Sequence, residues 1–211
     1  ILVHVPVAGG VAAKRYSQKG AVSIKASEKE AALSREIRKK PSDGNLKISL
    51  AAVKIEEGDY DVEKLISDGL MQGGDKNRGY SLLSVALAVK GDYQLAAKSA
   101  DRAGLHIYRD TLLFVGGMKK SAPNASLLKS SSSVEIPNGF ENFVSGLVAE
   151  KKGKNEDACR LFLKSYEEGL IGRLVVRKIL AAFGASGESF KKSKEGGAIV
   201  DRFADDYLQT M

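Results

Sequence analysis

The chain has 211 residues, 43% of them apolar and 28% charged, and it carries a formal net charge of +7. Such an apolar share supports a packed core and excludes wholesale disorder. One cysteine and two histidines exclude an intrachain disulfide and a cysteine-based zinc site. No run of about 18 apolar residues occurs, so no membrane-spanning helix is predicted within this chain.

Residues 1–27 are expected to form an extended arm followed by a polar linker. The arm begins with ILVHVPV, which favours β structure, and it is closed by Gly9-Gly10. The next residues, Val11-Ala12-Ala13, resemble the end of an export signal. This pattern favours the cell envelope or periplasm, with the cytoplasm as the alternative.

Residues 28–211 are predicted to form a single helical domain. Ser27 can cap a first helix, which is expected to stop before Pro41, and Ser42 or Asp43 is expected to cap the second. The helices that follow are predicted in pairs, over about 45–57 and 60–71, then over about 77–90 and 93–104. The links within each pair are two or three residues long, which makes its members antiparallel neighbours.

The second half of the domain is less regular. Gly116-Gly117 interrupts a segment of helical composition, and a Ser-rich stretch with two prolines follows. We therefore expect an irregular insertion over about 121–138. Helices are predicted to resume over about 139–152 and 155–168, followed by one in GRLVVRKILAAFG. A polar loop and an amphipathic capping helix over about 198–210 are expected to end the domain.

Two identical tripeptides mark an internal repeat. Gly58-Asp59-Tyr60 and Gly91-Asp92-Tyr93 lie 33 residues apart, each at the end of a helix-like run, and Gly153-Lys154-Asn155 is a weaker third copy. A period of about 33–34 residues is typical of stacked helical hairpins that share one elongated core. Such stacks usually present a surface to a partner, which favours a scaffold or adaptor.

The central hairpin resembles a tetratricopeptide repeat, in which small side chains let two helices pack tightly. The residues that match the family there are Leu83, Ser84, Leu87, Gly91, Tyr93, Ala96 and Ala103. The other hairpins match at Leu50, Ala51, Gly58 and Tyr60, and at Gly146, Gly153, Ala158 and Phe162. Glu63 departs from the pattern, which has Ala there. The resemblance covers about 28–110 and 139–170, with the Sel1-like repeats as an alternative.

The resemblance implies an all-α fold, a right-handed superhelical array of antiparallel helical hairpins. The physical requirement behind it does not depend on the family name. Ser84 and Ala96, like Gly146 and Ala158, are small at positions where two helices must approach closely. A bulky side chain at any of them would force the hairpin apart.

In that family the inner faces of the first helices line a concave groove, and the resemblance implies which residues would bind a partner here. The groove positions are Asn45, Ile48, Ala52, Ile55, Arg78, Ser81, Val85, Ala88, Phe140, Phe143 and Leu147. The set of Lys and Asn residues with which co-chaperones clamp a peptide carboxylate is absent, because Asn45 is the one residue of either type among these positions. A helix or an extended segment of a protein partner is therefore the expected occupant. The alternative is that the chain's own arm or loop packs there.

No constellation of catalytic residues is found. The two histidines are isolated, and no metal-binding motif or phosphate-binding loop is complete. We therefore expect no catalytic, cofactor or metal site and no enzyme activity. The predicted function is a scaffold that assembles a larger complex, such as a bacterial cell-envelope machine. The positive net charge leaves a basic nucleic-acid or membrane-surface module as the alternative.

Overall fold

The computed structural model describes residues 27–123, 128 and 134–204. The predicted arm before residue 27, much of the predicted insertion and the end of the predicted capping helix lie outside the described residues. Within the described ranges the fold is all-helical and contains no strand, which confirms the predicted fold class at that level. No described helix has the length and apolar character that crossing a membrane requires, as predicted.

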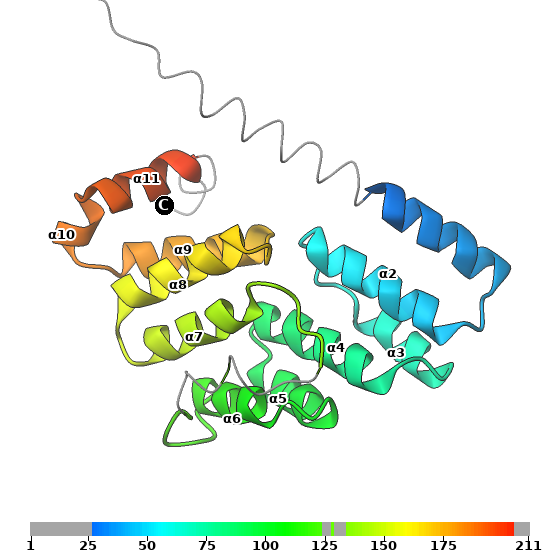
Figure 1. Ribbon diagram of the computed structural model, residues 1–211. Coiled ribbons are helices and arrows are strands. Elements are labelled where there is room, and N and C mark those ends of the chain that lie inside the picture. The colour runs from blue at the N-terminus through cyan, green and yellow to red at the C-terminus, as the bar shows by residue number, and fades with distance from the viewer. Residues whose placement is uncertain (1–26, 124–127, 129–133, 205–211) are drawn as a thin grey trace, which may run out of the picture.

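A first helix spans residues 27–39. The helices after it are α2 (Gly44–Glu56), α3 (Glu63–Met71), α4 (Lys76–Lys90), α5 (Tyr93–Arg102), α6 (His106–Val115), α7 (Phe140–Lys151), α8 (Asn155–Glu167), α9 (Arg173–Gly184), α10 (Glu188–Lys191) and α11 (Lys194–Arg202). From α2 to α9, each helix packs against the next one in the chain (Figure 1). One continuous apolar core runs through these helices and reaches Ile199 and Phe203 near the C-terminal end.

Two of the predicted signals for helix ends, Asp43 and Gly91, are confirmed, whereas Ser27, expected as a cap, lies within the first helix. The carboxylate of Asp43 caps α2 and accepts hydrogen bonds from the backbone N–H groups of Asn45 and Leu46, at 3.0 and 3.3 Å. Gly91 ends α4 with a φ of 92°, a left-handed conformation that glycine adopts at little cost. Asp92 stands at the cap position of α5, but its side chain makes no capping hydrogen bond.

The start of α3 differs from the sequence-based expectation. The helix begins at Glu63, whereas residue 60 was the predicted start. The carboxylate of Asp59 accepts a hydrogen bond from the N–H of Asp61 at 3.0 Å, which stabilises a turn at this point. Tyr60 lies in this turn, is 4% exposed and is engaged in a contact with a distant part of the chain. The tertiary contact therefore shortens the helix.

Small side chains lie at the helix crossings, as the sequence predicts. Ser84 of α4 and Ala96 of α5 are both fully buried on helices that pack together. At the crossing of α7 with α8, a Cβ atom on Gly146 would lie 2.6 Å from Cε1 of Phe162. The ring of Phe162 therefore occupies the space that any larger residue at position 146 would need.

The C-terminal segment is more helical than predicted. The polar stretch expected to be a loop contains α10 and the first residues of α11, which starts at Lys194. Arg202 of α11 donates to Glu167 of α8 at 2.7 Å, and the rings of Phe203 and Tyr166 meet edge to face with centroids 5.4 Å apart. Packing against α8 thus stabilises a segment whose sequence is polar and glycine-rich.

Two turns far apart in the sequence, one after α2 and one after α8, contact each other. The hydroxyl of Tyr60, after α2, donates to the backbone carbonyl of Ile171, between α8 and α9, at 2.6 Å. A Cβ atom on Gly58 would lie 2.7 Å from the Cα of Gly172. Figure 1 shows one end of α2 facing the nearby ends of α8 and α9. The backbones approach this closely because both residues are glycines with positive φ.

Candidate partner-binding surface

The predicted groove residues lie on α2, α4 and α7, and the structure buries most of them. The buried members, each at most 2% exposed, are Ile48, Ile55, Ser81, Val85, Ala88, Phe140, Phe143 and Leu147. Asn45 is exposed, and Ala52 and Arg78 are partly exposed. In this conformation, therefore, the last three are the predicted groove residues with side-chain surface available to a partner.

A loop of the chain itself contacts α4 at the predicted groove. The hydroxyl of Ser81 donates to the backbone carbonyl of Glu135 at 3.0 Å. The Glu135 carboxylate also forms an ion pair with Arg78, with Oε2 3.7 Å from Nε. Both contacts come from the end of the predicted insertion. The structure therefore agrees here with the alternative that the chain's own loop packs at these positions.

The groove positions on α7 and α2 are buried by neighbouring helices and turns. The ring of Phe140 stacks on Tyr108 of α6, and that of Phe143 packs at a tilt against Phe162 of α8, each pair with centroids 5.4 Å apart. On α2, Ile48 lies against the turn before α4, where a Cβ atom on Gly74 would come within 2.6 Å of its Cδ1. These side chains thus contribute to the core.

What remains open is a polar surface, the α2–α4 strip, defined by Asn45, Ser49, Ala52 and Arg78. The three α2 residues follow a spacing of four and three residues, which places them on one helix face. Arg78 donates to the hydroxyl of Ser49 at 3.2 Å, and Asn45 accepts from the backbone N–H of Asp75 at 2.8 Å. The guanidinium and the amide keep further donors for a bound segment.

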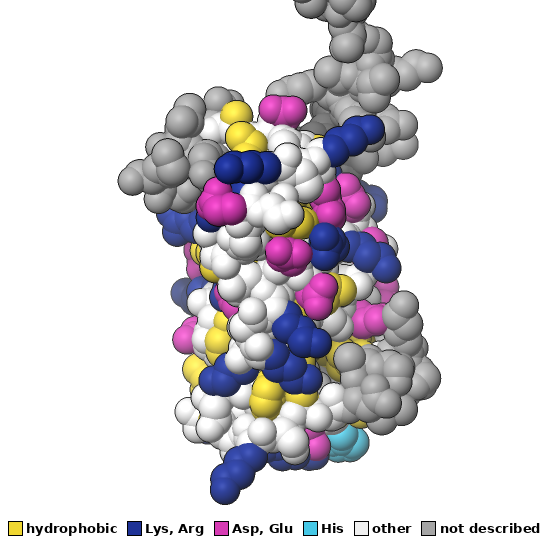
Figure 2. Space-filling model, turned by 90° about the vertical axis from the view of Figure 1, so that its left-hand side faces the viewer, with side chains coloured by type: hydrophobic (Ala, Val, Ile, Leu, Met, Phe, Trp, Pro, Cys, Tyr) yellow, Lys and Arg dark blue, Asp and Glu magenta, His cyan; other side chains and the backbone are white. Residues whose placement is uncertain are grey.

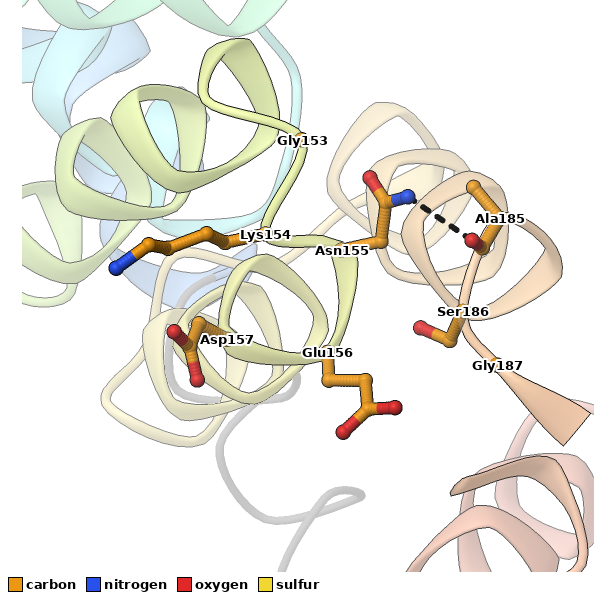
Figure 3. Close-up of a pocket in the computed structure, with 8 residues that line it drawn as sticks. All are labelled: Gly153, Lys154, Asn155, Glu156, Asp157, Ala185, Ser186 and Gly187. Carbon is orange, nitrogen blue, oxygen red and sulfur yellow. Dashed lines mark hydrogen bonds between the residues drawn. The ribbon is translucent and has the colours of Figure 1, made fainter. Parts of the chain in front are cut away.

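A separate cleft of about 320 Å³ lies between the α7–α8 turn and the α9–α10 turn (Figure 3). The amide of Asn155 donates to the carbonyl of Ala185 at 2.9 Å and so joins the two turns. Lys154 points away from the Ala185–Gly187 turn, and Ser186 donates to the carbonyl of Ala182 at 2.8 Å. These polar groups hold the turns together and do not converge on a common point. The cleft is therefore a weaker candidate than the strip.

The cysteine at position 159 is buried and forms no disulfide. Cys159 is fully buried in α8, and its thiol lies 3.7 Å from the carbonyl of Ile179. Burial raises the pKa of this thiol to about 12, which keeps it protonated at neutral pH. Among the described residues, no group of three or more His, Cys, Asp or Glu side chains is placed to hold a metal ion.

Comparison with known proteins yields no match. No protein family, no curated protein and no solved structure matches this chain. The resemblance to tetratricopeptide repeats therefore rests on the residues of the hairpins alone.

Proposed function

We propose that this chain is a non-enzymatic scaffold that binds a segment of a protein partner and helps to assemble a larger complex. Beyond the all-helical fold, we propose that the helices form a right-handed array of tetratricopeptide-like hairpins, as the sequence repeat implies. Helical arrays of this kind expose long surfaces relative to their volume, which suits them to recognise partners. The partner segment is a helix or an extended peptide.

The observation that carries the proposal is the α2–α4 strip. Asn45, Ala52 and Arg78 are the members of the predicted groove with open surface, and Ser49 is a partly exposed neighbour on α2. The strip is contributed by the first helices of two successive hairpins. The Arg78 side chain is 38% exposed, so its guanidinium is accessible although it contacts Ser49 and Glu135. A partner with a carboxylate or a main-chain carbonyl could bond to this group, while Ala52 offers a small flat area beside it.

The proposal can be tested by selecting displayed peptides on the immobilised full chain. Peptides that bind are then measured against two variants of the strip, Ala52→Arg and Arg78→Gln. Because one variant blocks the surface and the other removes a charged donor, we expect each to weaken binding at least tenfold, by about 1.4 kcal/mol. The exposed Lys98 on α5 supplies a matched control, Lys98→Gln, which should bind as the unchanged chain does.

Circular dichroism would show that all three variants keep the helical fold. The proposal would be wrong if the selected peptides bind the two strip variants as tightly as the unchanged chain. It would also be wrong if the selection yields no peptide whose binding depends on the strip.

A further inference from the structure

Five lysines lie in or beside two turns on one side of the molecule, and we call them the lysine edge. They are Lys119 and Lys120 after α6, and Lys151, Lys152 and Lys154 at the α7–α8 turn. All five are exposed. The two turns are close together, because a Cβ atom on Gly117 would lie 3.8 Å from Nζ of Lys151.

Within the part of the chain that the structure describes, most of the lysine edge has no neutralising partner. Lys119 forms an ion pair with Asp110 at 2.7 Å. For the other four ammonium groups, no carboxylate of the described residues lies within salt-bridge distance. Lys90, by contrast, is held by both Asp61 and Glu63, at 2.8 and 2.6 Å. The positive charge of the edge therefore remains available to an external anion.

An exposed apolar side chain belongs to the same region. Met118 directly precedes Lys119 and is 44% exposed. Figure 2 looks onto the end of the molecule where these turns lie, and Lys and Arg side chains gather in its lower half beside apolar ones. A flexible thioether chain among protruding lysines can enter the apolar boundary of a lipid layer while the ammonium groups stay at the headgroups.

We propose that the lysine edge binds the surface of an anionic membrane. The lysines are exposed in or beside two neighbouring turns, where a broad anionic surface can approach them. Lysine is a flexible point charge that suits scattered phosphate and carboxylate headgroups. A single-stranded nucleic acid would gain from exposed aromatic rings for base stacking, and the edge contributes none. The inference is independent of the proposed scaffold function, because the α2–α4 strip lies on other helices.

The test is co-sedimentation of the full chain with phospholipid vesicles at low salt, where charge contacts are least screened. We expect binding to vesicles with about 30% phosphatidylserine and little binding to pure phosphatidylcholine vesicles. The double variant Lys151→Gln and Lys152→Gln should lower the partition coefficient about 25-fold, at about fivefold per lysine, the factor that corresponds to about 1 kcal/mol. Met118→Ser should lower it further.

The matched control removes the same amount of charge elsewhere. Lys64→Gln with Lys98→Gln neutralises two exposed lysines on α3 and α5 and should leave most of the binding intact. The proposal is overturned if the control pair loses as much binding as the edge pair, or if anionic vesicles do not bind. It is equally overturned if duplex DNA or an acidic peptide binds the edge while anionic vesicles do not.

Discussion

Cys159 illustrates how the fold sets the chemistry of a single residue. The sequence places it on the apolar stripe that also carries Phe162 and Tyr166, and the structure buries it completely. Burial, with a smaller contribution from the carboxylate of Glu195, raises the pKa of the thiol to about 12. Because the folded-state pKa lies above that of an unfolded thiol, the protonated form contributes stability at neutral pH. That contribution is lost as the pH rises above the unfolded pKa.

A labelling experiment tests this environment. At pH 8 a pKa of about 12 leaves on the order of one thiol in ten thousand ionised. The folded chain should therefore react with a thiol reagent at least a hundredfold more slowly than the chain in denaturant. Equal rates in the two states would contradict the burial of Cys159, and the rate for free cysteine under each condition serves as the reference.

At the scale of helices, the spacing between α7 and α8 depends on one missing side chain. Gly146 faces the ring of Phe162. Because glycine has no Cβ atom, the ring can lie directly against the backbone of α7 where α7 and α8 cross. Gly197 of α11 is also a helical glycine, but a Cβ atom there would meet no heavy atom within 4 Å. Both glycines have the same low intrinsic helix propensity, but Gly146 lies against a ring and Gly197 lies beside open space.

The two glycines should therefore respond in opposite directions to alanine. We expect Gly146→Ala to lower the free energy of unfolding by about 1–3 kcal/mol, because the ring must shift. Gly197→Ala should raise it by about 0.5–1 kcal/mol, because alanine favours the helix and nothing opposes the added methyl group. Denaturant unfolding of both variants measures this difference, and a loss of the same size in each would show that the crossing is not tight.

At the scale of the whole molecule, a contact between the turn after α2 and the turn after α8 joins two distant parts of the chain. Tyr60 and Ile171 are 111 residues apart in the sequence, and their hydrogen bond joins the N-terminal and C-terminal thirds. Burial raises the pKa of the Tyr60 hydroxyl above its ordinary value, in keeping with a hydroxyl that donates to a carbonyl away from water. The glycine pair of the same contact leaves no room for a side chain.

A comparison of two left-handed glycines tests this contact. Gly58 and Gly73 have φ values of 82° and 80°, but a Cβ atom on Gly73 would have no neighbour within 4 Å. Gly73→Ala should cost about 1–2 kcal/mol through its backbone conformation alone. Gly58→Ala should cost about 1–3 kcal/mol more, because its methyl group would meet the backbone at Gly172. Equal losses in urea unfolding would argue against the contact.

Local signals in the sequence determined much of the helical architecture. The cap at Asp43 and the left-handed glycine at Gly91 each act within one or two turns of helix. The small residues at the crossings act between helices that follow each other in the chain, and their repeat made them visible in the sequence. The C-terminal segment was less predictable. Its helices gain much of their stability from packing against α8, and a polar composition gives no sign of that contact.

The tertiary structure alone decided which of the predicted groove residues face solvent. A repeat pattern identifies the inner face of each first helix, but it does not encode what lies against that face. Glu135 and Ser81 are bonded although 54 residues separate them, and Tyr60 and Ile171 although 111 do. No periodic pattern in the sequence indicates either contact. Such contacts form because the whole chain minimises its exposed apolar surface and satisfies its polar groups together. The helices can therefore be predicted from local sequence, whereas the exposure of each side chain depends on contacts that form only in the folded chain.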